Sequence, residues 1–313
     1  MKSNSITAVA PATSANLGSG FDVFSVALDI FFDTINVEMI EGGGIEIRVE
    51  GPGSASIPLD PDRNTAGIVA KALLSLSKRR HGLLIEIKKG IRPGSGLGSS
   101  AASAAAAVVA VNKLLNLNLS KLDLVRFAAQ GEIASAGAAH ADNVSAAILG
   151  QFNIIRCSNP LDVVNLSLPK NIGFAIVIPE ITHKTTSQAR SVLPEKVSLS
   201  DLVYHVGHAA TIVAGIALGD VSLMGKGMSD IVVEPARAHL IPGLAAVKKS
   251  AMNCGAAGVS ISGAGPSVIA LVNTNERRIS DVSRAMKEAF EDGGIKCEAL
   301  SAKPGPGARL LEQ

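Results

Sequence analysis

Three observations predict an α+β fold with two domains. The chain has 313 residues, and single hydrophobic cores stop growing at roughly 250–300 residues, so we expect two cores. The first third alternates strand-like runs with glycine turns, whereas the second half alternates buried strands with helices. Hydrophobic residues make up 47% of the chain and charged residues 18%, which is enough for a large interior. We place the division at residue 150, which gives domains 1–150 and 151–313.

The elements of the first half follow from period and turn chemistry. Glycines at 42–44 predict a hairpin between two of the strands. Apolar residues at helical spacing and a long alanine run predict the helices, and Ser120 is expected to cap the third of them. The expected strands are 23–32, 34–40, 45–51 and 83–91, and the expected helices are 64–82, 99–117 and 120–137.

The second half alternates the two kinds of element more regularly. A continuous apolar run predicts a buried strand at 172–180, and 257–272 is expected to form a strand, a glycine turn and a second strand. A last strand is expected at 295–303. The expected helices are 198–219, 241–255 and 275–294.

Composition argues against several classes of function. Net charge is only +2, and the chain has no Trp and one Tyr, so a basic face with base-stacking aromatics is not expected and we predict no nucleic-acid partner. Three isolated cysteines suit a reducing compartment. The N-terminus lacks the apolar core of a signal peptide, and the apolar run 101–111 is too short to span a bilayer, so we expect a cytoplasmic protein without membrane association.

The segment "RPGSGLGSSAAS", residues 92–103, is the strongest local signal of function. A strand, a glycine-rich turn and a helix direct backbone N–H groups and the helix dipole at one point, which is an anion site. The Walker A pattern requires Lys where this chain has Ser99, and the dinucleotide pattern requires Gly at the same place. The protein-kinase motifs are also absent.

The loop "GLGSSAA" resembles the phosphate-binding loop of the galactokinase, homoserine kinase, mevalonate kinase and phosphomevalonate kinase (GHMP) superfamily. Other motifs resemble those of its homoserine kinase family: "PATSANLGSGFDVFSVAL" at 11–28, "HADNVSAAILG" at 140–150, "PEITHKTTSQARSVLP" at 179–194, "DIVVEPARAHLIPG" at 230–243 and "ISGAGPS" at 261–267. Arg92 stands where the superfamily loop usually has proline, and Pro93 follows one residue late.

The resemblance implies the two-domain GHMP kinase fold, with an N-terminal ATP-binding domain like ribosomal protein S5 domain 2 and a ferredoxin-like C-terminal domain. It implies a homoserine kinase, which phosphorylates L-homoserine with ATP in threonine biosynthesis. The residues expected to bind ATP are Asn64 and the loop residues Arg92, Pro93, Gly94, Ser95, Gly96, Leu97, Gly98, Ser99, Ser100, Ala101 and Ala102. The resemblance also assigns Mg²⁺ to Ser100 and Glu132, and it suggests a homodimer.

L-Homoserine is a zwitterion with a primary hydroxyl, so its site needs guanidinium groups, a carboxylate and a neutral polar group. Arg190 and Arg237 are expected to bind its carboxylate, and Asp22 with Asn16 its ammonium. Asn143 is expected to orient the hydroxyl and is the candidate catalytic residue, together with Ser100 and Glu132. His140 either contacts the substrate or orders the loop that carries Asn143.

Two questions remain open at the level of sequence. Asp142 stands where mevalonate kinases carry a catalytic Asp in a similar "DN" pair, yet a loose phosphoryl-transfer transition state reduces the need for a base. Our hypothesis is that Asn143 orients the nucleophile and Asp142 supports it. The rival functions are a superfamily kinase for mevalonate or shikimate, which lack an ammonium group for Asp22, and a non-catalytic relative that binds protein or RNA.

Overall fold

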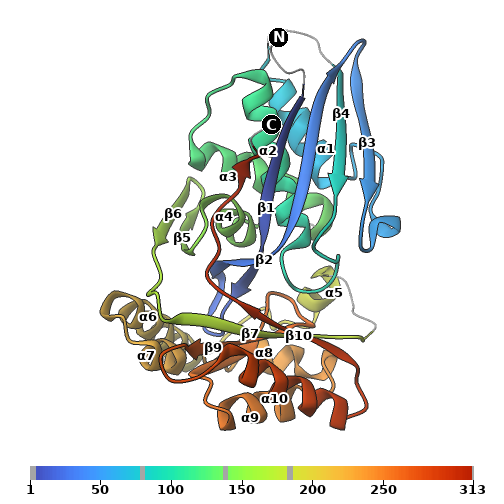
Figure 1. The fold of residues 1–313 in the computed structure, drawn as a ribbon. Coiled ribbons are helices and arrows are strands. Elements are labelled where there is room, and N and C mark those ends of the chain that lie inside the picture. The colour runs from blue at the N-terminus through green and yellow to red at the C-terminus, as the bar shows by residue number, and fades with distance from the viewer. Residues whose placement is uncertain (1–4, 78–81, 137–139, 182–185, 312–313) are drawn as a thin grey trace.

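The structure is a computed structural model that describes residues 5–77, 82–136, 140–181 and 186–311, and all structural statements concern these residues. Two β-sheets, each covered by helices, build the α+β architecture that the sequence predicts (Figure 1). One face of the second sheet joins the core of the first sheet, and its other face packs against its own helices. The two halves therefore share the first core, while the second sheet and its helices enclose a second core of their own.

The first sheet has seven strands in the order β11-β1-β2-β4-β3, with β5 paired to β2 and β6 to β5. Its strands are β1 (Ser5–Asn16), β2 (Gly20–Ile40), β3 (Gly44–Glu50), β4 (Gly82–Lys88), β5 (Phe152–Ser158), β6 (Leu161–Leu166) and β11 (Arg309–Leu310). Strand β2 is long enough to pair with β4 along its second half and with β5 near its start.

Two expectations for this sheet are wrong. The strands predicted at 23–32 and 34–40 are one strand, because Asp33 is fully buried within β2 and the chain passes through it without a turn. Strand β3 forms no hairpin with β2, since it pairs in parallel with β4, which lies between them. Parallel neighbours require a crossover, and helix α1 (Thr65–Leu74) supplies it between β3 and β4.

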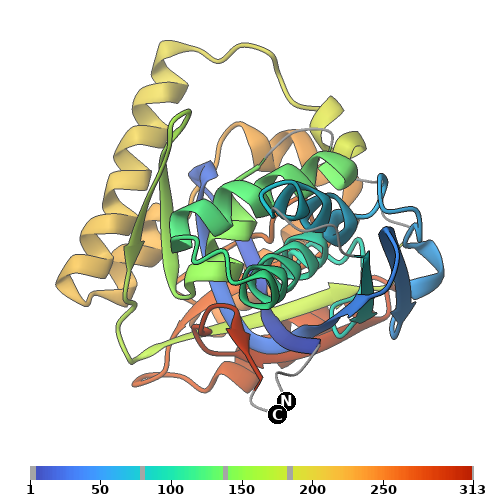
Figure 2. The same cartoon turned by 90° about the horizontal axis from the view of Figure 1, so that it is seen from above.

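Four helices cover one face of this sheet (Figures 1 and 2). They are α1, α2 (Ser99–Leu115), α3 (Lys121–Ala136) and α4 (Asp142–Leu149). Helix α2 lies against β1 and β2 on one side and α1 and α3 on the other. It is therefore buried almost all round, and its alanine-rich sequence allows this close approach. Ser120 accepts a hydrogen bond from the Asp123 amide at the start of α3, as expected of a cap.

The second sheet is antiparallel in the order β10-β7-β9-β8, with a helical connection before β8 and α10 before β10. This βαββαβ arrangement is the ferredoxin-like pattern that the resemblance implies. The strands are β7 (Ile172–Pro179), β8 (Gly258–Ile261), β9 (Val268–Asn273) and β10 (Cys297–Ala302). Helices α9 (Leu244–Asn253) and α10 (Ile279–Asp292) cover the face turned away from the first sheet (Figure 1).

Four further helices and two 3₁₀ turns complete the chain. They are α5 (Thr186–Ser191), α6 (Leu199–Leu218), α7 (Val221–Gly227), α8 (Val233–Arg237) and the turns Ser54–Ser56 and Ala238–Leu240. Helix α6 is long and apolar enough to cross a membrane by length and composition. Its Tyr204 bonds Ser229 and its His205 lies 3.4 Å from Asp230, contacts that belong to a helix packed on a folded domain.

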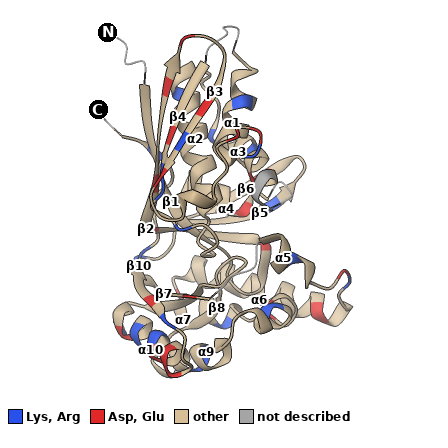
Figure 3. Ribbon diagram, turned by 90° about the vertical axis from the view of Figure 1, so that its right-hand side faces the viewer, with Lys and Arg blue, Asp and Glu red and all other residues tan. Residues whose placement is uncertain are grey.

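Sheet membership does not change at residue 150, where we expected a domain boundary. Strands β5 and β6 extend the first sheet, and the chain enters the second sheet only at β7. Near its end the chain returns to the first sheet as β11. Figure 3 shows acidic and basic residues interspersed over both halves, with α10 carrying both signs.

Candidate active site

The glycine-rich loop joins β4 to α2 and presents its backbone at the start of that helix. Gly94, Gly96 and Gly98 have φ values of 73°, 83° and 67°, a left-handed conformation that favours glycine. Gly98 is the N-cap of α2 and offers no side-chain cap, so the first amides of the helix remain available to a ligand. The loop therefore has the geometry of an anion site.

The second glycine turn, 261–267, holds this loop from the other sheet. Ser262 Oγ donates to the Gly96 carbonyl at 2.8 Å, and Ser267 donates through both Oγ and its amide to the Ser95 carbonyl. A Cβ on Gly96 would lie 2.7 Å from the carbonyl oxygens of Ser262 and Gly265. The motif "ISGAGPS" thus supports the glycine-rich loop, residues 92–100, which we call the phosphate loop after its expected role.

A cavity of about 420 Å³ opens beside the loop and draws its lining from both halves of the chain. Most of the residues predicted from sequence meet there: Asn16, Asp22, Asn64, Pro93, Gly94, Gly96, Gly98, Ser99, Ser100, Glu132, His140, Asn143, Arg190 and Arg237. Segments more than 200 residues apart in sequence, such as those of Asn16 and Arg237, therefore contribute to one concave site.

The remaining predicted residues lie elsewhere. Leu97, Ala101 and Ala102 are buried in the hydrophobic core. Arg92 and Ser95 line a neighbouring cavity, which shares Pro93 and Gly94 with the main one. Asn64 lines the main cavity, but its side chain caps α1: its carbonyl oxygen accepts from Ala66 and Gly67, and its amide donates to Pro58. The side chain of Asn64 therefore shapes the cavity wall by capping.

The junction of β1 and β2 presents Asn16, the last residue of β1, and Asp22, near the start of β2. Both residues have positive φ, 74° and 56°, a conformation that is uncommon for non-glycine residues and costs energy. Asn16 Nδ2 donates to the Gly263 carbonyl at 2.8 Å, while its Oδ1 accepts from the Asp22 amide at 3.1 Å. Asn16 thereby fixes the turn that carries Asp22 against the second half of the chain.

Asp22 forms an ion pair with Arg190, whose Nη1 lies 3.1 Å from Asp22 Oδ2. The sequence predicts that these two residues bind opposite ends of a zwitterion. In the structure they neutralise one another, and both side chains remain about one third exposed, 39% and 31%. The pair is accessible from the cavity, so a ligand with both charges can replace it.

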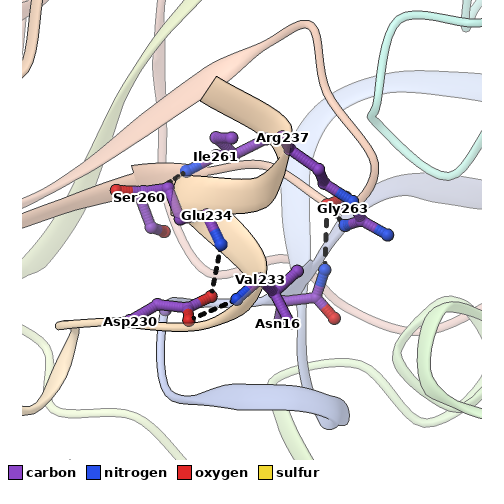
Figure 4. A pocket seen from close by; sticks show the side chains of 9 residues that line it. Asn16, Asp230, Val233, Glu234, Arg237, Ser260, Ile261 and Gly263 are labelled. Atoms are coloured by element: carbon purple, nitrogen blue, oxygen red, sulfur yellow. Dashed lines mark hydrogen bonds between the residues drawn. The ribbon is translucent and has the colours of Figure 1, made fainter. Parts of the chain in front are cut away.

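Arg237, on α8, lies deeper than Arg190. Its Nε donates to the Ala189 carbonyl at 3.0 Å. Its Nη1 donates to the Gly263 carbonyl at 3.1 Å (Figure 4). Asp230 accepts hydrogen bonds from the first amides of α8, which anchors the helix that carries Arg237. Burial and then the nearby Arg190 charge lower the pKa of Arg237. Even so, an arginine keeps its charge at any physiological pH.

At the other end of the cavity, Ser100 Oγ lies 3.1 Å from Glu132 Oε2, which joins the start of α2 to α3. Two hard oxygen donors at adjacent positions suit Mg²⁺, which takes few protein ligands and keeps several waters. Among the described residues there is no cluster of three His, Cys, Asp or Glu that would hold a transition metal.

Asn143 is the second residue of α4, directly after Asp142. Thr13 Oγ1 donates to Asn143 Oδ1 at 2.8 Å, and this oxygen faces Gly98 of the phosphate loop. Asn143 Nδ2 lies 3.5 Å from Asp142 Oδ1. Both neighbours favour the same orientation of the amide, with its oxygen toward Thr13 and its nitrogen toward the carboxylate.

Asp142 is buried, with 5% of its surface exposed. Desolvation raises its pKa, the Asn143 amide opposes the rise, and the Asp22 charge adds to it. A carboxyl with a raised pKa beside the expected nucleophile is a candidate for acid–base chemistry on electrostatic grounds. Its hydrogen bond to the backbone of Asn143, at 2.7 Å, gives it a structural use as well.

Sequence reasoning missed three features around this cavity. Thr13 orients Asn143, Phe21 lies beside both arginines, and Lys89 extends beneath the phosphate loop to Asp33. Phe21 and Thr13 lie inside the quoted motif 11–28, so that motif could have drawn attention to them. Lys89 has no local signal, because only the fold shows that it is buried.

Comparisons with known proteins assign this chain to a class of enzymes. The family model described as GHMP kinases N terminal domain matches residues 64–151, and GHMP kinases C terminal matches residues 212–292. The fold agrees: L. major mevalonate kinase in complex with R-mevalonate has a TM-score of 0.68 and 16% identity, covering 98% of this chain and 97% of that one. The chain is thus a GHMP kinase, an enzyme class that uses ATP.

More similar proteins narrow the class. Homoserine kinase of Natronomonas pharaonis is 46% identical over 98% of this chain and all of the relative, and that of Methanocella arvoryzae is 44% identical over 99% and 98%. A crystal structure of homoserine kinase from Cytophaga hutchinsonii has a TM-score of 0.94 at 38% identity, with 99% and 98% of the chains covered. The chain belongs to the homoserine kinase family.

Proposed function

We propose that the cavity between the phosphate loop and α8 carries out the homoserine kinase reaction, with ATP and Mg²⁺, in the cytoplasm as a step of threonine biosynthesis. In this reaction the γ-phosphoryl group of ATP passes to the side-chain hydroxyl of L-homoserine and gives O-phospho-L-homoserine. The observation that carries the proposal is the position of Asn143. Its side-chain oxygen faces Gly98 of the phosphate loop, and it shares the cavity with Asp22 and Arg190.

The amides of residues 94–100 would hold the phosphates of ATP. Glycine at 94, 96 and 98 lets the backbone adopt the required conformation, and the supports from Ser262 and Ser267 keep it there without ligand. Because the loop already has this conformation, no free energy is spent on ordering it when negative charge develops in the transition state. Such preorganisation is the main source of electrostatic catalysis.

Ser100 and Glu132 would hold Mg²⁺ through their oxygens. When bound, the cation would supply positive charge that offsets the negative charge of the phosphates. Glu132 is buried, with 6% of its surface exposed, so the cation would also compensate a desolvated carboxylate.

L-Homoserine would enter at the Asp22–Arg190 pair. Its carboxylate would bind Arg190 and Arg237, its ammonium Asp22 and Asn16, and His140 would border the site. The ligand thereby exchanges one internal ion pair for two intermolecular ones. A carboxylate without an ammonium group would break the same pair and leave Asp22 without a cation, which favours an amino acid over mevalonate or shikimate.

The chemistry then requires positioning more than a base. Asn143 Nδ2 would donate to the substrate hydroxyl oxygen, since Thr13 occupies the amide oxygen. The hydroxyl oxygen forms the new bond to phosphorus, the bond to the ADP oxygen breaks, and the hydroxyl proton passes to a phosphoryl oxygen. Asp142 holds the backbone of Asn143 rather than accepting this proton.

Release of ADP from Mg-ATP by the purified chain tests the assignment, with L-homoserine, D-homoserine, L-serine, mevalonate and shikimate compared. We expect turnover only with L-homoserine. Turnover with mevalonate or shikimate would overturn the role of Asp22, and no turnover with any of the five would overturn the enzymatic assignment. Thermal stabilisation by ATP measures nucleotide binding separately from turnover.

We also propose that the chain forms a homodimer through α6. This helix stands at the periphery of the molecule (Figure 2), and every exposed residue between Leu202 and Leu218 is apolar or glycine. A charge-free stripe along a 20-residue helix is unusual for a surface exposed to water.

Light scattering at micromolar concentration should give twice the chain mass, and V206E should give a monomer. V164E, on exposed β6, is the control, and a monomeric wild type would contradict the proposal.

A further inference from the structure

We propose that Phe21 is a positioning residue for substrate binding: its ring holds the guanidinium groups of Arg190 and Arg237 together at one carboxylate-binding site. The guanidinium carbon of Arg190 lies 5.3 Å from the ring centroid and that of Arg237 lies 5.5 Å from it. Both distances fall within the range of a cation–π contact. Phe21 is half-buried and lines the same cavity as the two arginines.

The two arginines need such a contact because they come from different elements and repel each other. Arg190 is on the short helix α5 and Arg237 on α8. Burial and then the Arg190 charge lower the pKa of Arg237, as expected of two like charges at one site. A neutral aromatic face attracts both cations and adds no formal charge that would compete with a substrate carboxylate.

The ring itself is held firmly by the turn between β1 and β2. Asn16 bonds Gly263, and Ser19 Oγ donates to the Gly227 carbonyl at 2.8 Å, so the turn is fastened to the second half of the chain on both sides. A Cβ on Gly18 would lie 2.4 Å from the Met228 carbonyl oxygen, so the backbones are in close contact there. The position of Phe21 relative to both arginines is therefore set by packing.

This arrangement gives Phe21 a use that differs from that of other aromatic residues in the chain. Phe24 packs on Phe152 within the core, with ring centroids 5.1 Å apart. Phe32 contacts Arg309 at 5.2 Å, outside the residues that line the cavity. Phe21 alone among these three contacts two cations, and both cations line the cavity. We infer that it helps to determine selectivity for a carboxylate-bearing substrate.

The inference rests on the proposed role of the two arginines, and steady-state kinetics of F21L tests it. Two contacts worth roughly 2.3- to 5.4-fold each predict a rise of about fivefold to thirtyfold in the KM for L-homoserine. The KM for ATP and kcat at saturation should change by less than about twofold, because the ring acts on the two arginines and not on the groups that bind the phosphates. F21Y keeps an aromatic face and should restore most of the affinity, and F21M is a second apolar variant should F21L fold poorly.

A second readout separates positioning of guanidinium groups from general loosening. 3-Amino-1-propanol lacks the carboxylate of homoserine and serves as a substrate or a competitive inhibitor. F21L should weaken the binding of L-homoserine but not that of this amine. The preference for L-homoserine over the amine should therefore fall by the same factor of about fivefold to thirtyfold. F32L, which removes an Arg–Phe contact elsewhere, should leave that preference unchanged.

The outcomes are distinguishable. An equal loss for L-homoserine and the amine, or an equal loss in F21L and F32L, would show a merely structural role for Phe21. An unchanged KM in F21L would also overturn the inference. If R190L and R237L leave the homoserine KM unchanged, the proposed carboxylate site itself is wrong. If they raise it and F21L does not, only the role of Phe21 is wrong.

Discussion

Two ion pairs flank the same cavity and differ in their burial and in the number of their hydrogen-bond partners. Asp33 and Lys89 lie beneath the phosphate loop with side chains 0% and 1% exposed, whereas Asp22 and Arg190 lie at the substrate end, 39% and 31% exposed. Asp33 accepts from the amides of Gly90 and Ile91, and Lys89 also donates to the Ser99 carbonyl and to Ser103. Every polar group of the buried pair has a partner within the chain.

The exposed pair is not saturated in this way. Among the described residues, the Arg190 side chain bonds only the carboxylate of Asp22 and otherwise contacts the Phe21 ring, so replacing Asp22 leaves no buried group without a bond. A buried, fully bonded pair can only be broken at a large cost, while an accessible pair can be exchanged for ligand groups. The comparison shows that a carboxylate–cation pair can stabilise the fold where it is buried and bind a ligand where it is accessible.

The largest effect is expected from D33N, which removes the negative charge from the buried pair. Lys89 is left in the interior beside a neutral amide, and burial already lowers the pKa of this amine. Leaving a buried charge without its partner costs about 3–5 kcal/mol, so urea unfolding should show a loss of that size. D62N removes the same charge from the exposed Lys71–Asp62 pair and should cost less than about 1 kcal/mol. Equal losses in the two variants would contradict the contrast.

R237L addresses the recognition side. Removing one partner of a desolvated charge pair costs roughly 2–5 kcal/mol, which corresponds to a rise of about 30-fold to several thousandfold in the KM for L-homoserine. The KM for ATP should change far less. An equal loss for both substrates would show that Arg237 serves the phosphates instead.

D22N repeats the Asp→Asn change at the accessible pair. We expect a change of less than about 1 kcal/mol in unfolding free energy, because the pair is solvated. The KM for L-homoserine should rise about tenfold or more, since a hydrogen bond to a charged group is worth roughly 1.5–3 kcal/mol. D33N and D22N together therefore separate stability from binding. A stability loss in D22N as large as in D33N would mean that both pairs are structural.

D142N gives the smallest expected effect on turnover. Loss of a true general base costs about 10²–10⁴-fold, so retention of more than a tenth of kcat supports the base-free mechanism. If turnover disappears while ATP and homoserine still bind, Asp142 is the base.

The same variant has a pH signature. A carboxyl whose folded pKa is raised stabilises the fold most below its unfolded pKa, near 4, and that contribution is lost as the pH rises through the folded pKa. D142N is neutral at every pH, so its melting temperature relative to wild type should increase as the pH rises above about 4. A difference that does not depend on pH would contradict a raised pKa.

Much of the site could be predicted because its signals are local. The phosphate loop, the alanine-rich α2, the cap at Ser120 and the family motifs each occupy a short segment whose chemistry does not depend on distant residues. Several helices were also predicted close to their observed bounds, since apolar residues at helical spacing identify them.

Strand partners could not be predicted in the same way. Nothing in residues 42–50 indicates that β4 lies between β2 and β3, and nothing near residue 150 indicates that β5 and β6 extend the first sheet. Pairing depends on which edge is free once the crossover helix has packed, and that is a property of the whole domain.

The sequence alone therefore determined which chemical groups are present: a glycine loop for phosphates, two arginines, paired acids and amides in a known order. Only the tertiary structure decided how these groups are combined. Asp22 pairs with Arg190, which is 168 residues away, Thr13 with Asn143, 130 residues away, and Phe21 lies beside both arginines. The physical reason is that the energy of such a contact depends on the distance between the two groups in the folded chain and on their exposure to water. The local sequence specifies neither quantity.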